Sequence, residues 1–184
     1  SLNKLTYMKF KLLTSLLLVV LLNTTSFAQN FEKGDKALGF GIGFGTNYYG
    51  SQAIPPISVS FDLGIHEKIS VGAIFGFGTN TYSYSSLYKW RYTHILFGAR
   101  GNYHWGKHIS ALPEKLDLYA GAFLGFDVVK VDYDGYTGID GEDYGGLILG
   151  GQVGARWYFS DKFAAFVEGG VGLSAARLGV TLRL

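Results

Sequence analysis

The feature that most constrains this chain is an alternation of apolar residues with small or polar ones over residues 57–79. Every odd position from Ile57 to Ile65 is apolar, and serine, aspartate or glycine stands at each even position between them. After the turn at 66–68, apolar residues again occupy every odd position from Ile69 to Phe77. Because side chains alternate between the two faces of a strand, this stretch predicts two antiparallel strands joined by a tight hairpin.

The same alternation recurs along the rest of the chain and predicts eight strands. They are expected at about 38–44, 57–65, 69–79, 90–105, 116–131, 145–159, 163–173 and 177–184. Residues 47–56, 80–89 and 132–143 are expected to form longer loops, the first because Pro55 and Pro56 cannot donate to a ladder. Strands joined by hairpins are antiparallel, and an even number lets the last strand pair with the first and remove both edges.

Two closed barrels fit eight alternating strands: a soluble one with its apolar side chains inside, and a membrane one with them outside. Composition favours the membrane barrel. Charged residues make up 16% of the chain, against roughly 25% in soluble domains, and the non-apolar face is mostly glycine, serine and threonine. Such a face suits a crowded lumen better than a surface in water. We therefore predict an all-β fold, an eight-stranded antiparallel up-and-down transmembrane β-barrel.

Aromatic residues near the expected strand ends agree with this prediction, because membrane barrels carry aromatic girdles at both interfaces. The expected girdle at the short turns comprises Tyr103, Trp105, Trp157 and Phe159, and the one at the long loops comprises Tyr48, Tyr49, Tyr88, Trp90 and Tyr144.

Residues 1–28 are typical of an N-terminal segment with a secretory signal peptide that starts at Met8. Two lysines precede the largely apolar run from Leu12 to Leu22, and Ser26 and Ala28 place small residues before a cleavage site. The apolar run has eleven residues, too few for a membrane-spanning helix, which needs about 20. We expect cleavage after Ala28, which leaves residues 29–184 as the barrel domain.

Charge and motifs exclude several classes of function. Three of the 16 basic residues lie in residues 1–28, which leaves 13 against 14 acidic residues in the rest of the chain. A nearly neutral chain argues against nucleic acid as a partner. There is no cysteine, the four histidines are scattered and no G-x-S-x-G motif is present. We therefore expect no cofactor, and no enzymatic activity, because the sequence places no nucleophile next to a base.

The glycine-alternating segments 38–44 and 178–184 resemble strands of the bacterial outer membrane protein β-barrel domain family, which includes small eight-stranded barrels such as OmpX, the OmpA barrel and opacity proteins. The resemblance covers residues 29–184. It implies a barrel in the bacterial outer membrane with both termini in the periplasm, contact with outer-membrane lipid and lipopolysaccharide, and a monomer. It also implies recognition of the last strand by the barrel assembly machinery. That strand usually ends in an aromatic residue in the family, whereas this chain ends in Leu184.

The most informative polar residues fall on the expected lumen face. They are Asp62, Arg100, Asp117, Arg156, Glu168 and Arg183. Counted from the short turns, Asp62, Arg100, Arg156 and Glu168 are expected at a similar height, with Asp117 and Arg183 as lower candidates. A buried charge is costly unless it is paired, and eight strands enclose a space just wide enough for side chains. These residues therefore predict a charge network that fills the lumen; an ion path or an acid–base site is the alternative.

The segments expected at the loop end carry a candidate binding surface rich in tyrosine, formed by Tyr48, Tyr49, Tyr82, Tyr84, Tyr88, Tyr133 and Tyr136. Loops rich in tyrosine, serine and glycine form adaptable binding surfaces, although tyrosines next to strands also serve as interface anchors. The acidic residues in 132–143 could hold calcium, but their spacing matches no EF-hand. The expected function is a structural or surface-interaction role for an unknown ligand. The alternatives are a narrow porin or transporter of small or hydrophobic molecules and, less favoured, a membrane-embedded lipid-modifying enzyme.

Overall fold

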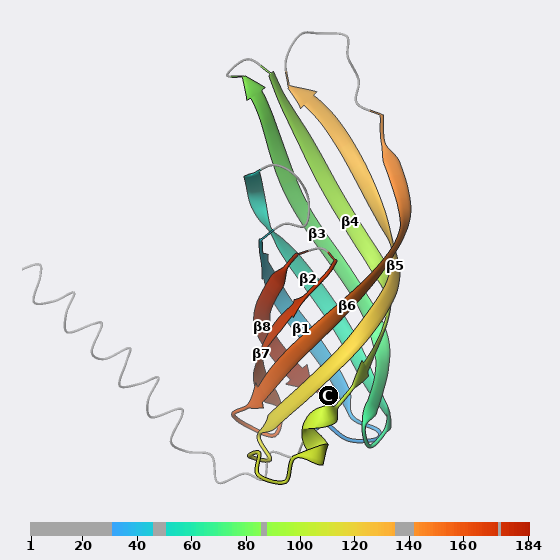
Figure 1. The fold of residues 1–184 in the computed structure, drawn as a ribbon, viewed down its shortest axis with the longest axis vertical. Coiled ribbons are helices and arrows are strands. Elements are labelled where there is room, and N and C mark those ends of the chain that lie inside the picture. Colours follow the sequence, from blue (N-terminus) through green and yellow to red (C-terminus); the bar gives the residue numbers. More distant parts are fainter. Residues whose placement is uncertain (1–30, 46–50, 86–87, 135–141, 173) are drawn as a thin grey trace, which may run out of the picture.

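The computed structural model describes residues 31–45, 51–85, 88–134, 142–172 and 174–184. They form a closed barrel in which each strand pairs antiparallel with the next and β8 pairs with β1 (Figure 1). The strands are β1 (Lys36–Phe44), β2 (Ser51–His66), β3 (Ile69–Ser85), β4 (Tyr88–Tyr103), β5 (Leu116–Asp134), β6 (Tyr144–Tyr158), β7 (Phe163–Gly170) and β8 (Ala176–Arg183). The predicted fold class is confirmed. The predicted signal peptide lies outside the described residues.

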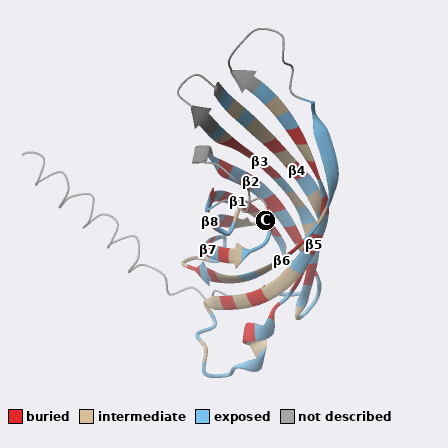
Figure 2. Ribbon diagram, turned by 45° about the horizontal axis from the view of Figure 1, so that its top comes forward, coloured by how far each residue is buried: buried red, intermediate tan, exposed pale blue. Residues whose placement is uncertain are grey.

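The alternation in the sequence becomes an alternation between the outside of the barrel and its lumen, as the striped colouring of the strands shows (Figure 2). Apolar residues point outward and are exposed, with Leu147 at 80%. Polar and charged residues point inward and are buried, with Asp62 at 2%. This is the arrangement of a membrane barrel, because a soluble barrel would bury the apolar face.

The wall of the barrel differs greatly in height. The strands β1, β7 and β8 have 9, 8 and 8 residues, whereas β3, β4 and β5 have 17, 16 and 19. In Figure 1 the long strands rise well beyond the level at which β7, β8 and β1 stop. We call this the tall end of the barrel, and the opposite end, with the β2–β3 and β6–β7 turns, the short-turn end.

Two of the predicted loops are wrong, because strands occupy most of their length. The β2 strand begins at Ser51, although Pro55 and Pro56 are skipped in the pairing with β3, as their missing N–H groups require. Residues 80–85 continue β3 and pair with β4, which already begins at Tyr88. Tyrosine, serine and threonine fit a pleated sheet well, and 80–89 contains neither glycine nor proline to end a strand.

Aromatic residues are exposed on the outside of the barrel at the short-turn end, where the sequence predicts a girdle. Tyr103, Trp105 and Trp157 are exposed there, and Trp105 begins a single 3₁₀ turn, Trp105–His108, instead of ending β4. At the tall end, Trp90 and Tyr144 lie at even positions of β4 and β6, the positions that face the lumen lower down, and Tyr48 and Tyr49 lie outside the described residues, so the second girdle stays a prediction. No helix in the described part of the chain is long and apolar enough to cross a membrane.

Candidate functional site

Six buried charged residues form a chain of alternating sign across the lumen, which we call the lumen network. Its members are Asp117, Arg156, Asp62, Arg100, Glu168 and Arg177, in order of contact. They come from β5, β6, β2, β4, β7 and β8, so strands that are not neighbours in the wall are joined across the interior. Each charge has a partner of opposite sign, which offsets the cost of removing it from water.

Arg100 is the central bridge of the lumen network. Its Nε lies 3.1 Å from Asp62 Oδ1, and its Nη2 lies 2.9 Å from Glu168 Oε1. Asn102, on the same face of β4, supports this arrangement by donating to Asp62 Oδ1 and accepting from Arg100 Nη2. The guanidinium thereby ties β4 to both β2 and β7 across the barrel.

Arg156 reaches the carboxylates on the side nearer the short-turn end. Its Nη2 lies 3.2 Å from Asp62 Oδ2, and its Nη1 lies 3.7 Å from Asp117 Oδ2. The guanidinium is also 5.1 Å from the centre of the Tyr119 ring, close enough for a cation–π contact. Gly154 makes room for that ring, because a Cβ there would lie 2.6 Å from Tyr119 Cζ.

Glu168 gathers three donors at the other end of the network. Arg100 and the Tyr119 hydroxyl donate to its Oε1, at 2.9 and 2.8 Å, and Arg177 Nε donates to its Oε2. Arg177 stands directly opposite Glu168 in the β7–β8 register and also donates to Ser58 Oγ at 2.9 Å. The sequence analysis did not single out Arg177, although its even spacing from Arg183 along an alternating strand placed it on the lumen face.

A short segment before β1 covers the network at the short-turn end. The Phe31 ring is 1% exposed, stacks on His104 at 4.9 Å between ring centres and lies 5.5 Å from the Arg156 guanidinium. Gly34 N donates to Gly64 O, and Gly64 N donates to Asp35 O. Gly64 permits this approach, because a Cβ there would lie 1.9 Å from Glu32 O. No sequence pattern pointed to Phe31, since it lies outside every alternating segment.

Beside Phe31, the side chains of Ser70, His104 and Asp117 form a hydrogen-bonded relay like the catalytic triad of a serine hydrolase. His104 Nδ1 lies 2.8 Å from Asp117 Oδ1, and His104 Nε2 lies 3.0 Å from Ser70 Oγ. Sequence spacing could not reveal this set, since β3, the end of β4 and β5 meet only through the barrel register. Ser70 is 0% exposed and its Oγ also accepts from Asn102 Nδ2, so a substrate cannot reach it in this structure.

The remaining predicted lumen residue, Arg183, lies near the short-turn end. Its Nε is 3.5 Å from Asp35 Oδ2, and its guanidinium stands 4.3 Å from the centre of the Tyr158 ring. Arg183 therefore helps to hold the segment before β1 through its ion pair with Asp35. Arg156, for its part, pairs with Asp62 and Asp117 and not with Glu168.

The described tyrosines of the candidate binding surface lie in strands and not in the expected loops. Tyr82 lies in β3 and is 47% exposed, and Tyr84, Tyr88 and Tyr133 also lie within strands. Tyr48, Tyr49 and Tyr136 lie outside the described residues, as do residues 135–141 of the acidic segment considered for calcium. Among the described residues, no group of three or more histidine, aspartate or glutamate side chains is arranged to hold a metal ion.

A closed barrel with an apolar exterior and charged interior defines a small membrane-spanning β-barrel protein. The N-terminal β-barrel domain of Pseudomonas aeruginosa OprF has this fold, with 13% identity, a TM-score of 0.53, and coverage of 84% of this chain and 100% of that one. The attachment invasion locus protein Ail of Yersinia pestis is similar at 12% identity and a TM-score of 0.50, covering 82% and 95%. No family model and no curated protein sequence matches the chain. At these identities, the similarity concerns the fold.

Proposed function

We propose that the protein is an outer-membrane barrel whose lumen is closed to solutes and whose tall strands form an interaction surface outside the cell. The short-turn end, with both ends of the barrel domain, then faces the periplasm. The observation that carries this proposal is the difference in height between the long strands β2–β6 and the short strands β7, β8 and β1.

The outward residues of the long strands support a surface beyond the membrane. Outward positions on β3 and β4 are apolar up to Phe77 and Ile95, which pair with each other. Above that level the outward residues become polar, as at Thr81 and Arg91. A spanning strand needs about 9–11 residues, so strands of 16 to 19 residues extend past the bilayer. Tyr82, exposed near the top of β3, belongs to this extension.

The same surface supports lipopolysaccharide as a partner. Lys89, Arg91 and Lys130 are exposed on the outer face of β4 and β5, just above the apolar band. Lysine and arginine at this level suit the phosphate groups of an anionic outer leaflet. Recognition by the barrel assembly machinery through β8 remains part of the proposal, as does a monomeric state.

A deletion within the β3–β4 hairpin tests the surface role. Thr81 pairs with Arg91, so replacing 82–90 by a two-residue Asn-Gly turn shortens the hairpin without changing the register below. Cells displaying the native or the shortened protein would be compared for adhesion to an array of immobilised serum proteins and glycans. We expect at least one immobilised partner to be lost on shortening, while heat-modifiable migration on gels is retained. Equal adhesion of both forms to every spot would refute the surface role.

A further inference from the structure

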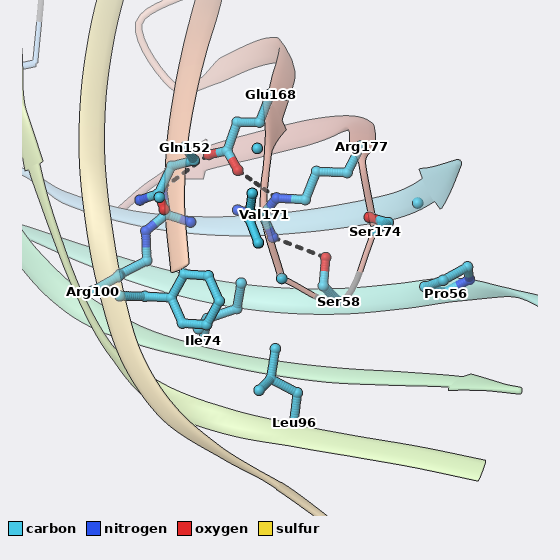
Figure 3. A pocket seen from close by; sticks show the side chains of 16 residues that line it. Pro56, Ser58, Ile74, Leu96, Arg100, Gln152, Glu168, Val171, Ser174 and Arg177 are labelled. Carbon is cyan, nitrogen blue, oxygen red and sulfur yellow. Dashed lines mark hydrogen bonds and ion pairs between the residues drawn. The ribbon is translucent and has the colours of Figure 1, made fainter. Parts of the chain in front are cut away.

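A small cavity lies inside the barrel next to the Arg177–Glu168 pair, at the level where β7 ends and β8 begins. Its volume is ≈ 50 Å³, and its lining combines Arg177, Gln152 and two serines on one side with apolar residues on the other (Figure 3). A water needs roughly 10–15 Å³ measured in this way, so the cavity has room for only a few atoms of a ligand.

The polar side of the cavity presents hydrogen-bonding groups that the protein leaves unused. A guanidinium has five N–H donors; Arg177 directs Nε to Glu168 and Nη1 to Ser58, and no residue in the described part of the chain accepts from its Nη2. Gln152 donates from Nε2 to Asn102 at 2.8 Å, which leaves its Oε1 as an acceptor at the cavity. The site therefore offers both a donor and an acceptor.

The opposite side is apolar, although it faces the lumen. Ile74, Leu96 and Phe123 lie at inward positions on three adjacent strands. The Phe123 ring is held in place over Gly150, where a Cβ would lie only 2.1 Å from Phe123 Cε1. These side chains provide a preformed apolar wall.

Charge decides which polar group fits. The lumen network contains three arginines and three carboxylates in alternating contact, so its charges already balance. An anionic ligand would add a buried charge without a counterion, which is costly. A neutral hydroxyl satisfies the site better, because it can accept from Arg177 Nη2 and donate to Gln152 Oε1 without adding charge.

We propose that this cavity binds small neutral alcohols, with the hydroxyl between Arg177 and Gln152 and the apolar body against Leu96 and Phe123. The inference does not depend on the surface role, since it concerns the lumen only. It assigns a ligand class to a part of the barrel that is otherwise structural.

The test uses 2,2,2-trifluoroethanol, the smallest trifluoromethyl alcohol, as the probe and ¹⁹F NMR on the full-length mature protein in lipid nanodiscs, with empty nanodiscs as the reference for partition into lipid. We expect saturable binding, at least tenfold tighter than that of trifluoroacetate, which has a carboxylate in place of the CH₂OH group. Arg177→Met removes the donors at similar length and should weaken binding at least tenfold. Arg183→Met is the matched control, because Arg183 pairs with Asp35 away from the cavity.

A second pair of variants keeps the test decisive if Arg177→Met does not fold. Leu96→Trp fills the cavity from its apolar side and leaves the lumen network intact, so it should abolish saturable binding. Leu149→Trp, on the outer face, should not. The proposal is overturned if the signal in protein-containing nanodiscs equals that in empty ones, if the carboxylate binds as tightly as the alcohol, or if the control variants weaken binding as much as the cavity variants.

Discussion

Among single residues, Glu168 shows most clearly how this lumen tolerates charge. Its carboxylate takes hydrogen bonds from Arg100, Arg177 and Tyr119. Removing the carboxylate would take away the ion-pair partner of Arg177 and leave Arg100 with Asp62 alone, in a low-dielectric interior. The contribution of each residue to stability therefore depends on its partners, and a single substitution measures the cost of leaving those partners unpaired.

The first prediction is a double-mutant cycle on Glu168 and Arg177. Glu168→Ala should lower the free energy of unfolding by about 3–5 kcal/mol, the usual cost of removing one partner of a buried pair. The double variant with Arg177→Ala should cost less than the sum of the two single changes, because it removes a contacting pair. Urea unfolding in detergent micelles, followed by tryptophan fluorescence, measures all four corners of the cycle.

Arg156→Ala supplies the matched comparison for that cycle. Arg156 is also buried and charged, but its ion pairs are with Asp62 and Asp117. The coupling of Arg156 to Glu168 should therefore be clearly smaller than the coupling of Arg177 to Glu168. Equal coupling energies in the two cycles would contradict the contact order of the lumen network.

The second prediction concerns Ser70, which has the hydrogen-bond partners of a catalytic serine without access. Its full burial and the Phe31 ring beside His104 should prevent attack on any substrate, so Ser70 should not react with a fluorophosphonate probe. The measurement is mass spectrometry of the labelled protein after digestion, with a serine hydrolase as positive control. Stoichiometric labelling of Ser70 that disappears in His104→Ala would show that the relay is catalytic.

For whole elements, the sequence predicts the direction of side chains much better than it predicts where strands end. Successive side chains of a strand point to opposite faces because of backbone geometry alone, so Asp62 and Arg156 fall on the lumen face as expected. Strand ends depend on pairing between distant segments. The residues 80–85 look like a loop when read alone, yet they pair with β4 because the partner strand is present. Local composition does not contain that information.

The third prediction concerns the segment from Phe31 to Asp35 that covers the short-turn end. Phe31→Ala should reduce the free energy of unfolding by at most about 3–5 kcal/mol, the range for a phenylalanine truncated in a fixed core, since this segment can detach. Hydrogen–deuterium exchange should accelerate at Gly34 and Gly64, whose N–H groups join the segment to β2. Urea unfolding and exchange mass spectrometry check the two effects.

Phe163→Ala is the control for this prediction. Phe163 is a phenylalanine at the same end of the barrel, but it points outward and is 47% exposed. Its truncation should leave exchange at Gly34 and Gly64 unchanged. If Phe31→Ala also leaves exchange there unchanged, the Phe31 side chain does not anchor the segment.

In the whole molecule, the partners inside the lumen follow from closure of the barrel. The sequence predicts which charges face inward, because side chains alternate between the two faces of a strand. It also predicts that these charges pair, because a buried charge without a partner is costly. It does not predict that Arg100, and not Arg156, contacts Glu168, because a contact between strands that are not neighbours depends on the stagger around all eight strands. Nor does it predict the Phe31 contact with His104, since the segment before β1 has no periodic pattern and is placed by the barrel that it covers.

The last prediction is that the native barrel conducts no steady ionic current. An eight-stranded barrel has an interior only just wide enough for side chains, and here Arg100 and Arg156 cross it while Phe31 covers one end. The native protein inserted in planar bilayers should therefore give no stable conductance steps. The triple variant Phe31→Ala, Asp62→Ala and Arg156→Ala removes the cover and one contacting pair of opposite charges, so it should give small steps while keeping heat-modifiable migration. Steady conductance from the native protein, or its absence from a correctly folded triple variant, would show that these side chains do not close the lumen.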